Sequence, residues 1–413
     1  MSEQTVSDKG NAPASAAPAI VARGLSKRFN RRLGRSDRSQ LAIWFWELDR
    51  VTLTLIGILM AIGLIAVAAA SPATAARLST DSVTLDPLYF FYRQLRWLIL
   101  GVPGMIVISM LPKTQARRLA IAAMVFFGML LILVPVIGET KNGAQRWIGY
   151  GLTIQPSEFL KPAFAVTIAW ILSLKARDPE LPVMSVTFGI TCIVGFFLMA
   201  QPNLGGTIVF FGIWFVLALL AGLSFQVIAG SIVAGIGGLT TAYLFYPVAT
   251  QRINAWLFGG ESYDQVALAH NTLTNGGFIG AGPGLGTAKF RLPEAHTDYI
   301  FSVIGEEFGL LACAAIAILY LVFIARVLLR LQEEKNLFLS LAVTGLAAQI
   351  GGQAMINLAV NLQLFPSKGM TLPFISYGGS SMLALCFSAG LLLALSRRNP
   401  YLDRSSFDRS WQQ

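Results

Sequence analysis

The chain has 413 residues, of which 55% are hydrophobic and 13% are charged. Soluble domains carry about a quarter charged residues, so this composition excludes a large water-soluble enzyme and indicates a polytopic membrane protein. The net charge of +10 comes mainly from lysines and arginines in the connections between apolar runs, a bias that sets membrane orientation and does not indicate nucleic-acid binding. Three cysteines lie inside apolar runs and there are two histidines, so neither a disulfide scaffold nor a cysteine or histidine metal centre is expected.

Ten apolar runs are each long enough, at about 20 residues, to cross a bilayer as a helix. Because the runs are continuous and do not alternate between apolar and polar residues, they exclude a transmembrane barrel. We therefore predict an all-α polytopic membrane protein with ten transmembrane helices. The predicted ranges are 51–71, 94–111, 118–138, 157–174, 183–200, 204–221, 227–248, 299–325, 338–362 and 376–396.

Most lysines and arginines of the connections fall on one side of the membrane when the N-terminus is placed in the cytoplasm, so both termini are expected there. The predicted organisation is a disordered basic cytoplasmic tail over 1–49, a ten-helix domain over 50–398 and a cytoplasmic C-terminal tail over 399–413. The basic cluster from Lys27 to Arg38 fits binding to anionic headgroups, and it fits a disordered retention tail equally well.

The segment 249–298 is expected to form one long outer, periplasmic loop between the seventh and eighth helices, whereas most other connections are short. Loops of this length in compact proteins are usually functional or disordered. The glycine-rich run over 276–286 permits close backbone approach and anion-binding N–H groups. No lysine follows a spaced glycine as in a nucleotide P-loop, so a flexible hinge and a phosphate cradle are both open.

Asp298 lies at the start of the eighth predicted helix, at the outer boundary of the bilayer. Alone, such an aspartate is best interpreted as an N-cap that accepts hydrogen bonds from the first N–H groups of the helix. The charged or titratable residues near it in the sequence are Lys289, Arg291, Glu294, His296, Glu306 and Glu307. Because acidic residues inside a membrane helix are costly unless they are paired or hydrated, this group favours a polar cavity that opens outward.

Two further polar segments interrupt the apolar runs. Glu158 and Lys161, just after Pro156, are three residues apart and therefore share one helix face. Whether they form an internal ion pair or face a substrate is open, since intramembrane charges are functional candidates by default. In the segment 372–381, small residues at a helix start either permit close packing, which is the favoured interpretation, or offer backbone N–H groups to a diphosphate.

Five motifs occur in this order along the chain: Gly143-Ala144-Gln145-Arg146-Trp147-Ile148, Gln155-Pro156-Ser157-Glu158 with Lys161, Gln201-Pro202-Asn203-Leu204-Gly205, Pro293-Glu294-Ala295-His296-Thr297-Asp298 with Gly305-Glu306-Glu307, and the run from Lys368 to Ser381. Together they resemble the motifs of the SEDS (shape, elongation, division and sporulation) family. The resemblance covers the whole membrane region. Ala295 and the pair Lys368-Gly369 favour the division branch of the family over the elongation branch, while Gln145 stands where many members have serine.

The resemblance implies a ten-helix peptidoglycan glycosyltransferase that polymerises lipid II, an undecaprenyl-diphosphate-linked disaccharide-pentapeptide, on the outer face of the bacterial cytoplasmic (inner) membrane. It also implies a class B penicillin-binding protein as transpeptidase partner, further membrane proteins of the division machinery, and a place at the division septum. The essential aspartate of the family falls on Asp298, and its glutamate and lysine fall on Glu158 and Lys161.

These assignments lead to a mechanistic hypothesis. The 4-hydroxyl of an acceptor sugar attacks the anomeric carbon of a donor sugar with inversion, and Asp298 is the base that takes the hydroxyl proton. The lipid diphosphate leaves as a stable anion, which cationic side chains stabilise, with a divalent cation such as Mg²⁺ or Mn²⁺ as an optional helper, and Glu158 orients Lys161. The candidate substrate-binding residues are Glu158, Lys161, Arg146, Lys368, Lys289 and Arg291.

Two other functions remain open from the sequence. A lipid II flippase also needs many helices, a polar cavity and intramembrane charges, but its essential charges should be reachable from both membrane faces. A non-catalytic scaffold for the division machinery would need no catalytic residue at Asp298. The candidate charges map mainly to one outer face, which favours chemistry there.

Overall fold

A computed structural model describes residues 40–80, 84–141, 144–149, 153–222, 225–258, 261–366 and 369–398. Asp49–Ser396 form one compact unit. Outside this unit, Gln40–Glu47 form the short helix α2, within the segment expected to be a disordered tail. The remainder of both predicted tails, residues 1–39 and 399–413, lies outside the described residues.

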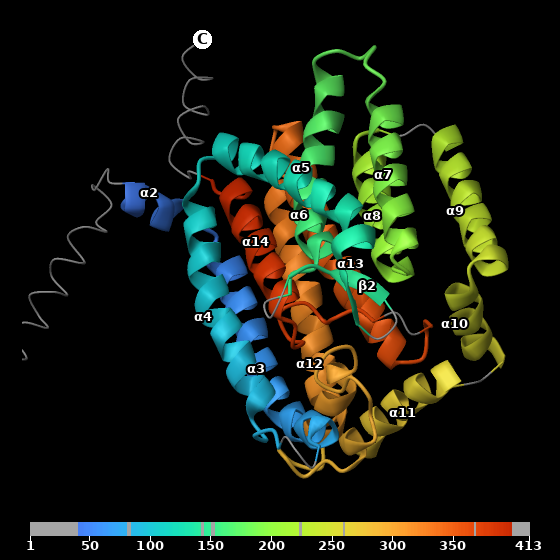
Figure 1. Cartoon of the computed structure of the whole chain (residues 1–413). Coiled ribbons are helices and arrows are strands. Elements are labelled where there is room, and N and C mark those ends of the chain that lie inside the picture. Colours follow the sequence, from blue (N-terminus) through green and yellow to red (C-terminus); the bar gives the residue numbers. More distant parts are fainter. Residues whose placement is uncertain are drawn as a thin grey trace, which may run out of the picture. The chain divides into compact units, whose positions relative to one another are not determined.

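Each of the ten predicted spans coincides with a helix of the compact unit (Figure 1). These helices are α3 (Arg50–Leu78), α4 (Tyr89–Met110), α5 (Lys113–Ile137), α6 (Pro156–Ser173), α7 (Val183–Ala200), α8 (Leu204–Leu220), α9 (Phe225–Phe245), α12 (Ile300–Leu331), α13 (Leu337–Asn361) and α14 (Gly379–Leu395). Within the described ranges, 7 helices are long and apolar enough to cross a membrane, and α8 and α14 are shorter apolar helices. The fold class is therefore confirmed, while the count of ten spans stays a prediction.

Local sequence signals explain where several helices begin. Asp49 precedes α3 and accepts hydrogen bonds from the Val51 N–H at 3.2 Å and the Thr52 hydroxyl at 2.8 Å. Pro156 occupies the first turn of α6, where a missing N–H costs nothing. Asn203 caps α8 by accepting a hydrogen bond from the Gly206 N–H at 3.0 Å.

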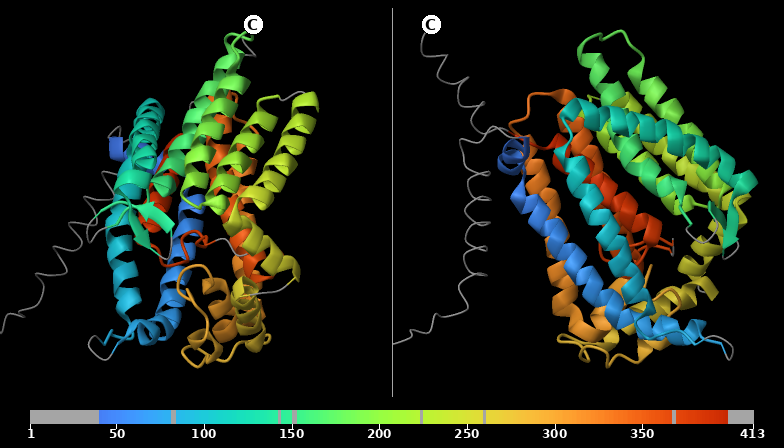
Figure 2. Two further views of the ribbon diagram at one scale, coloured as in Figure 1. Left: turned by 45° about the vertical axis from the view of Figure 1, so that its right-hand side comes forward. Right: turned by 60° about the vertical axis from the view of Figure 1, so that its left-hand side comes forward.

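Two helices form the centre of the packing. Within the most apolar stretch of 18 residues, 72% of the residues of α13 and 61% of those of α6 are buried. In the corresponding stretch of α9, 0% are buried. α6 contacts α5, α8, α13 and α14, and α9 packs mainly on α10 (Pro247–Phe258). Figure 2 shows α3 and α4 side by side, with α12 along α3. Polar residues on α6 and α13 therefore lie deep in the unit and must find partners there.

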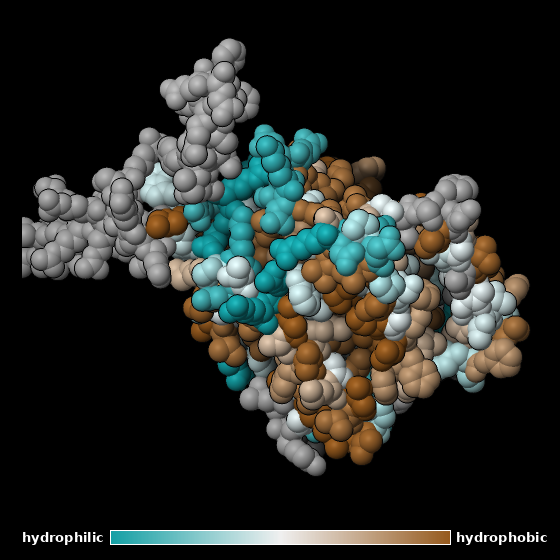
Figure 3. All heavy atoms as spheres, turned by 90° about the horizontal axis from the view of Figure 1, so that it is seen from above, coloured by the Kyte–Doolittle hydropathy of each residue, from teal (hydrophilic) through white to brown (hydrophobic). Residues whose placement is uncertain are grey.

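The outer surface of the helices is apolar. Large hydrophobic side chains are exposed along α4, α5, α7, α9 and α12, for example Val136 and Phe245, each 80% exposed. The end of the molecule at which α5 and α7 begin carries a band of hydrophilic residues bordered by apolar ones (Figure 3). Apolar helix sides with polar ends are the pattern of a chain that crosses a membrane several times, so the chain is a multi-pass membrane protein.

The segment expected to be one long loop contains regular structure. After α10, residues Glu261–Asn275 form α11, and Ala288–Phe290 form a single 3₁₀ turn, η2. Two short strands that the sequence did not suggest also occur: β1 (Glu139–Lys141) and β2 (Ala144–Trp147) pair antiparallel, with Thr140 opposite Gln145. Another 3₁₀ turn, η1 (Leu174–Ala176), continues α6.

A break in α12 at Gly309 lets this helix hydrogen-bond to the glycine-rich run over 276–286. Gly309 has φ 81° and ψ 175°, so the helix is interrupted between its first nine residues and the long apolar remainder. Two backbone N–H groups beyond the break, those of Leu310 and Leu311, donate to the carbonyls of Gly277 and Phe278 at 2.9 and 3.3 Å. A Cβ at Gly309 would collide with the Phe278 carbonyl oxygen, so both the conformation and the contact require glycine.

Candidate functional site

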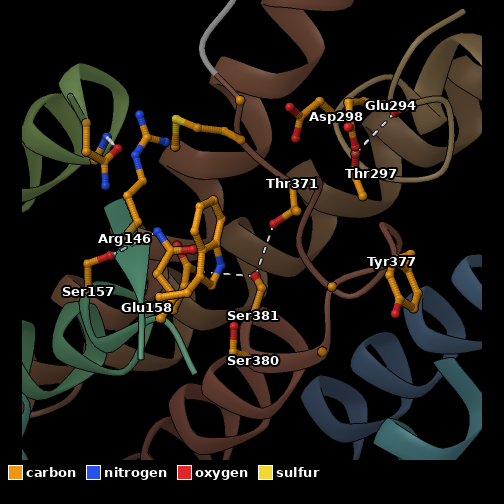
Figure 4. A pocket seen from close by; sticks show the side chains of 18 of the residues that line it. Arg146, Ser157, Glu158, Glu294, Thr297, Asp298, Thr371, Tyr377, Ser380 and Ser381 are labelled. Atoms are coloured by element: carbon orange, nitrogen blue, oxygen red, sulfur yellow. Dashed lines mark hydrogen bonds between the residues drawn. The ribbon is translucent and has the colours of Figure 1, made fainter. Parts of the chain in front are cut away.

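One cavity of about 790 Å³ lies where β2, α6, α10 and the two loops before α12 and α14 meet. It brings together four of the residues predicted from the sequence: Arg146, Glu158, Lys161 and Asp298. Figure 4 shows Arg146 and Asp298 on facing walls of this pocket, with Glu158 and Ser381 between the walls. Arg291 and Lys289 do not line it, and Lys368 lies outside the described residues.

Asp298 offers an unengaged carboxylate to the pocket. Its half-buried side chain accepts no hydrogen bond and forms no ion pair with any residue that the structure describes. Its backbone is held firmly, because Asn357 and Asn361 of α13 donate to its carbonyl oxygen at 2.8 and 3.2 Å. The interpretation of Asp298 as a helix cap is wrong, because α12 begins at Ile300 and residue 299 is its N-cap.

The surroundings of Asp298 suit a proton acceptor. Burial, the largest cause, and the negative charge of Glu294 raise the pKa of Asp298 to about 7, and the positive charges of Arg252 and Arg146 limit this rise. A carboxyl whose pKa lies close to neutral both exists as the anion and holds a proton effectively. Glu294 has a backbone φ of 53°, an uncommon conformation of the kind that clusters at functional sites.

Glu158 and Lys161 belong to a closed polar ring. Lys161 Nζ lies 2.7 Å from Glu158 Oε1 and donates to Gln353 Oε1 at 3.0 Å. The Gln353 amide donates to Thr371, whose hydroxyl lies 3.1 Å from that of Ser381. Ser381 closes the ring by donating to Glu158 Oε2 at 3.1 Å. The ring joins α6, α13, the loop before α14 and α14 itself, so the structure contains the internal ion pair that was one of the two interpretations.

Arg146 is fixed by backbone carbonyls. Its Nε donates to the Gln201 carbonyl at 3.0 Å, and its Nη2 donates to the carbonyl of Pro202. Strand β2 thus attaches to the turn between α7 and α8, which joins two of the motifs noted in the sequence. Burial and the nearby Arg252 lower the pKa of Arg146 from its ordinary value, since both disfavour the charged form. The remaining nitrogen, Nη1, is the part of Arg146 left for a ligand.

His296 has a structural role. Its Nδ1 lies 3.1 Å from the Thr74 hydroxyl, and its ring centroid lies 4.3 Å from that of Phe90 and 5.2 Å from that of Tyr377. Burial and the positive charge of Arg77 lower the pKa of His296 to about 4. The ring is therefore neutral at pH 7 and packs the turn that carries Asp298.

Lys289 and the two glutamates of α12 form a separate buried cluster. Lys289 Nζ donates to the Ala69 carbonyl at 2.9 Å and pairs with Glu307. The Glu306 carboxylate accepts the N–H groups of Ala288 and Lys289 at 2.6 and 3.0 Å. Glu307 also accepts a hydrogen bond from the Gly284 N–H at 3.1 Å, so both glutamates are satisfied by the segment before Asp298, and neither lines the cavity. Arg291 is exposed and lies outside the pocket.

The pocket supplies few metal ligands. Across the part of the chain that the structure describes, no group of three His, Cys, Asp or Glu side chains is arranged to hold a metal ion. Of the carboxylates that line the pocket, Glu158 is engaged by Lys161 and Ser381. Asp298 and Glu294 suit a hard cation that takes its other ligands from a substrate phosphate and water.

Sequence reasoning assigned no role to several residues that line the pocket or hold its loops. Arg252 of α10 lines the pocket and lies in the segment that was interpreted as a loop. Gln353, Asn357 and Asn361 bind the pocket loops from α13. Their spacing of four residues within an apolar helix was a usable signal, because such residues share one face.

Comparison with known proteins places the chain in a family. The model of a cell cycle protein family, that of FtsW, RodA and SpoVE, matches residues 49–401. A Caulobacter vibrioides protein named probable peptidoglycan glycosyltransferase FtsW is 35% identical over 373 residues, covering 89% of this chain and 93% of the relative. A Geobacter protein with the same name is 34% identical, covering 85% of this chain and 97% of the relative.

Solved structures agree with this relationship. A chain from work described as the structural coordination of polymerization and crosslinking by a peptidoglycan synthase complex has a TM-score of 0.69 at 27% identity, covering 84% of this chain and 97% of that one. The rod shape determining protein RodA of Thermus thermophilus has a TM-score of 0.62 at 26% identity, covering 84% of this chain and 96% of that one. The chain therefore belongs to the FtsW, RodA and SpoVE family of cell cycle proteins, the SEDS family.

Proposed function

We propose that the chain is a peptidoglycan glycosyltransferase that polymerises lipid II into glycan strands during septal cell-wall synthesis. Relatives that cover most of the chain are named peptidoglycan glycosyltransferases. The observation that carries the proposal is the unengaged carboxylate of Asp298, which faces a polar cavity of about 790 Å³ and has a pKa near neutral. An enzyme that activates a sugar hydroxyl needs such a base.

In the proposed reaction, Asp298 takes the proton of the acceptor 4-hydroxyl as its oxygen attacks the donor anomeric carbon. The bond from that carbon to the lipid diphosphate breaks, and its electron pair leaves on the diphosphate oxygen. An inverting hydrolase uses one carboxyl group as base and a second as acid for the leaving group. The lipid diphosphate is already a stable anion and needs no proton, so one carboxylate base and cationic stabilisation are sufficient here. Asn357 and Asn361 hold the Asp298 backbone during this step.

The roles of the other candidate residues follow from their contacts. Arg146 faces the pocket and keeps Nη1 for an anion, so we assign it to the diphosphate. Lys161 already engages Glu158 and Gln353, so we assign the Glu158–Lys161 ion pair a structural role in the wall of the pocket. Lys289 and Arg291 are left out of the substrate-binding set because they do not line the pocket. A divalent cation, Mg²⁺ or Mn²⁺, would arrive with the diphosphate and reduce its charge.

Partner and location follow the same proposal. We assign a class B penicillin-binding protein as the crosslinking partner, supported by the likeness to a chain of a peptidoglycan synthase complex. Other membrane proteins of the division machinery are further partners. The proposed location is the bacterial inner membrane at the septum, with the pocket facing outward, where lipid-linked disaccharides meet water.

A polymerisation assay in detergent micelles tests this function against its two competitors. We expect the purified protein, supplied with lipid II and its transpeptidase partner, to produce glycan strands. A flippase makes no product in micelles because they have no second leaflet, and a scaffold makes none under any condition. Absence of strands from a folded protein in complex with its partner would contradict the proposal.

A further inference from the structure

The pocket contains one arginine whose guanidinium has no partner among the described residues. Other cations that line the pocket are each held by the protein: Arg77 by the Leu292 carbonyl at 3.0 Å, Arg93 by the Tyr89 hydroxyl at 3.2 Å, Arg146 by two carbonyls, and Lys161 by Glu158 and Gln353. Arg252 lines the same pocket and forms no hydrogen bond or ion pair within the described ranges. A half-buried guanidinium without an acceptor is costly unless a ligand supplies one.

The helix that carries Arg252 is nevertheless anchored. Asn254 accepts a hydrogen bond from the Tyr243 hydroxyl at 2.9 Å, and the Trp256 indole donates to the Gln363 carbonyl at 3.1 Å. These contacts attach α10 to α9 and to the turn that ends α13. Arg252 is therefore held at the pocket by its helix while its guanidinium remains available.

The charges around Arg252 match a polyanion. Arg252 and Arg146 line the same pocket, and the positive charge of Arg252 lowers the pKa of Arg146. Asp298 forms no ion pair with either, as far as the described residues go. A single carboxylate would leave one guanidinium uncompensated, whereas a diphosphate carries enough charge for both. Guanidinium groups also match phosphate oxygens with paired, planar hydrogen bonds.

We infer that Arg252, together with Nη1 of Arg146, binds the diphosphate of the lipid-linked donor sugar. This inference rests on the proposed function and divides the pocket into two sides. Asp298 acts on the acceptor hydroxyl, and the two arginines stabilise the negative charge that gathers on the diphosphate as the anomeric C–O bond breaks. In this arrangement Lys161 stabilises the pocket wall through its ion pair with Glu158 and does not contact the leaving group.

Lipid binding to the full-length protein in micelles tests the assignment directly. The probes are undecaprenyl diphosphate and undecaprenyl monophosphate, and the variants are Arg252→Gln, Arg252→Lys and, as a matched control, Arg96→Gln, which changes an exposed arginine of α4 outside the pocket. We expect Arg252→Gln to weaken diphosphate binding about tenfold or more and to lose the preference over the monophosphate. Arg252→Lys should keep part of the affinity, and Arg96→Gln should stay within about twofold of the parent.

Unchanged diphosphate affinity in a folded Arg252→Gln protein would overturn the inference. The same would follow if Arg252→Gln polymerised lipid II with the KM and kcat of the parent. Failure of the proposed function gives a different result: diphosphate binding would still depend on Arg252, but no strands would form with the parent protein.

Discussion

At the scale of single residues, the ionisation of Asp298 decides when the pocket is active. Burial and Glu294 raise its pKa to about 7, and only the ionised carboxylate accepts a proton. Strand synthesis should therefore increase with pH through a midpoint near 7 and level off above it. The measurement is the initial rate of polymerisation from pH 5.5 to 9 at saturating lipid II.

A substitution that changes one neighbouring charge checks the cause of this midpoint. Glu294→Gln removes a negative charge that raises the pKa of Asp298, so the midpoint should fall by about 0.5 to 1 pH unit. Glu180→Gln, at an exposed glutamate outside the pocket, should leave it unchanged. A midpoint that rises in Glu294→Gln would contradict the electrostatic account of the site.

Residue pairs that are close in sequence could be predicted, and pairs that are distant could not. The spacing of Glu158 and Lys161 placed them on one helix face, and their ion pair follows from it. The partners of Lys289 and the availability of Arg252 depend on which helices pack together. No local pattern encodes that information, so Lys289 was included among the substrate residues and Arg252 was missed.

At the scale of elements, the break in α12 holds the loop before Asp298. Gly309→Ala should lower the melting temperature, because φ of 81° disfavours any side chain and a Cβ would collide with the Phe278 carbonyl oxygen. The expected loss of stability is about 2 kcal/mol or more. The matched control is Gly128→Ala in α5, where a Cβ would meet nothing within 4 Å and helix propensity favours alanine.

Thermal unfolding of both variants in the same detergent gives the comparison. Equal melting temperatures for Gly309→Ala and the parent would show that the break does not stabilise the loop.

The glycine-rich run was interpreted as a hinge or a phosphate cradle, yet several of its N–H groups bind Glu306 and Glu307. Gly276 and Gly280 are needed because the loop lies directly against the backbone of α12 at these positions.

Long helices were predictable because a bilayer requires continuous apolar runs. The two helices inside 249–298 were not, since α11 has a sequence without net apolar character and α10 is only 12 residues long. The β1–β2 hairpin was also missed, because strands of 3 and 4 residues carry too few positions to show alternation.

At the scale of the whole molecule, the pocket is assembled from segments that are far apart in the chain. β2, α6, α10, the turn at Asp298 and the start of α14 each contribute side chains, and the amides of α13 tie the two loops together. Apart from α10, these segments carry family motifs found in the sequence. This explains why a resemblance of short motifs located much of the site, while the contacts between the motifs required the structure.

The rate of strand formation by Asp298→Asn tests the central claim most directly. With folded protein, the transpeptidase partner and lipid II, we expect a rate at least about a hundredfold below that of the parent, while Asp178→Asn, an exposed control outside the pocket, should match the parent. Because the pKa of Asp298 is raised in the folded state, its ionisation costs stability as pH rises from about 4 to 7. Asp298→Asn should therefore melt no lower than the parent at pH 8. Polymerisation at the parental rate by Asp298→Asn would contradict the assignment of Asp298 as the base.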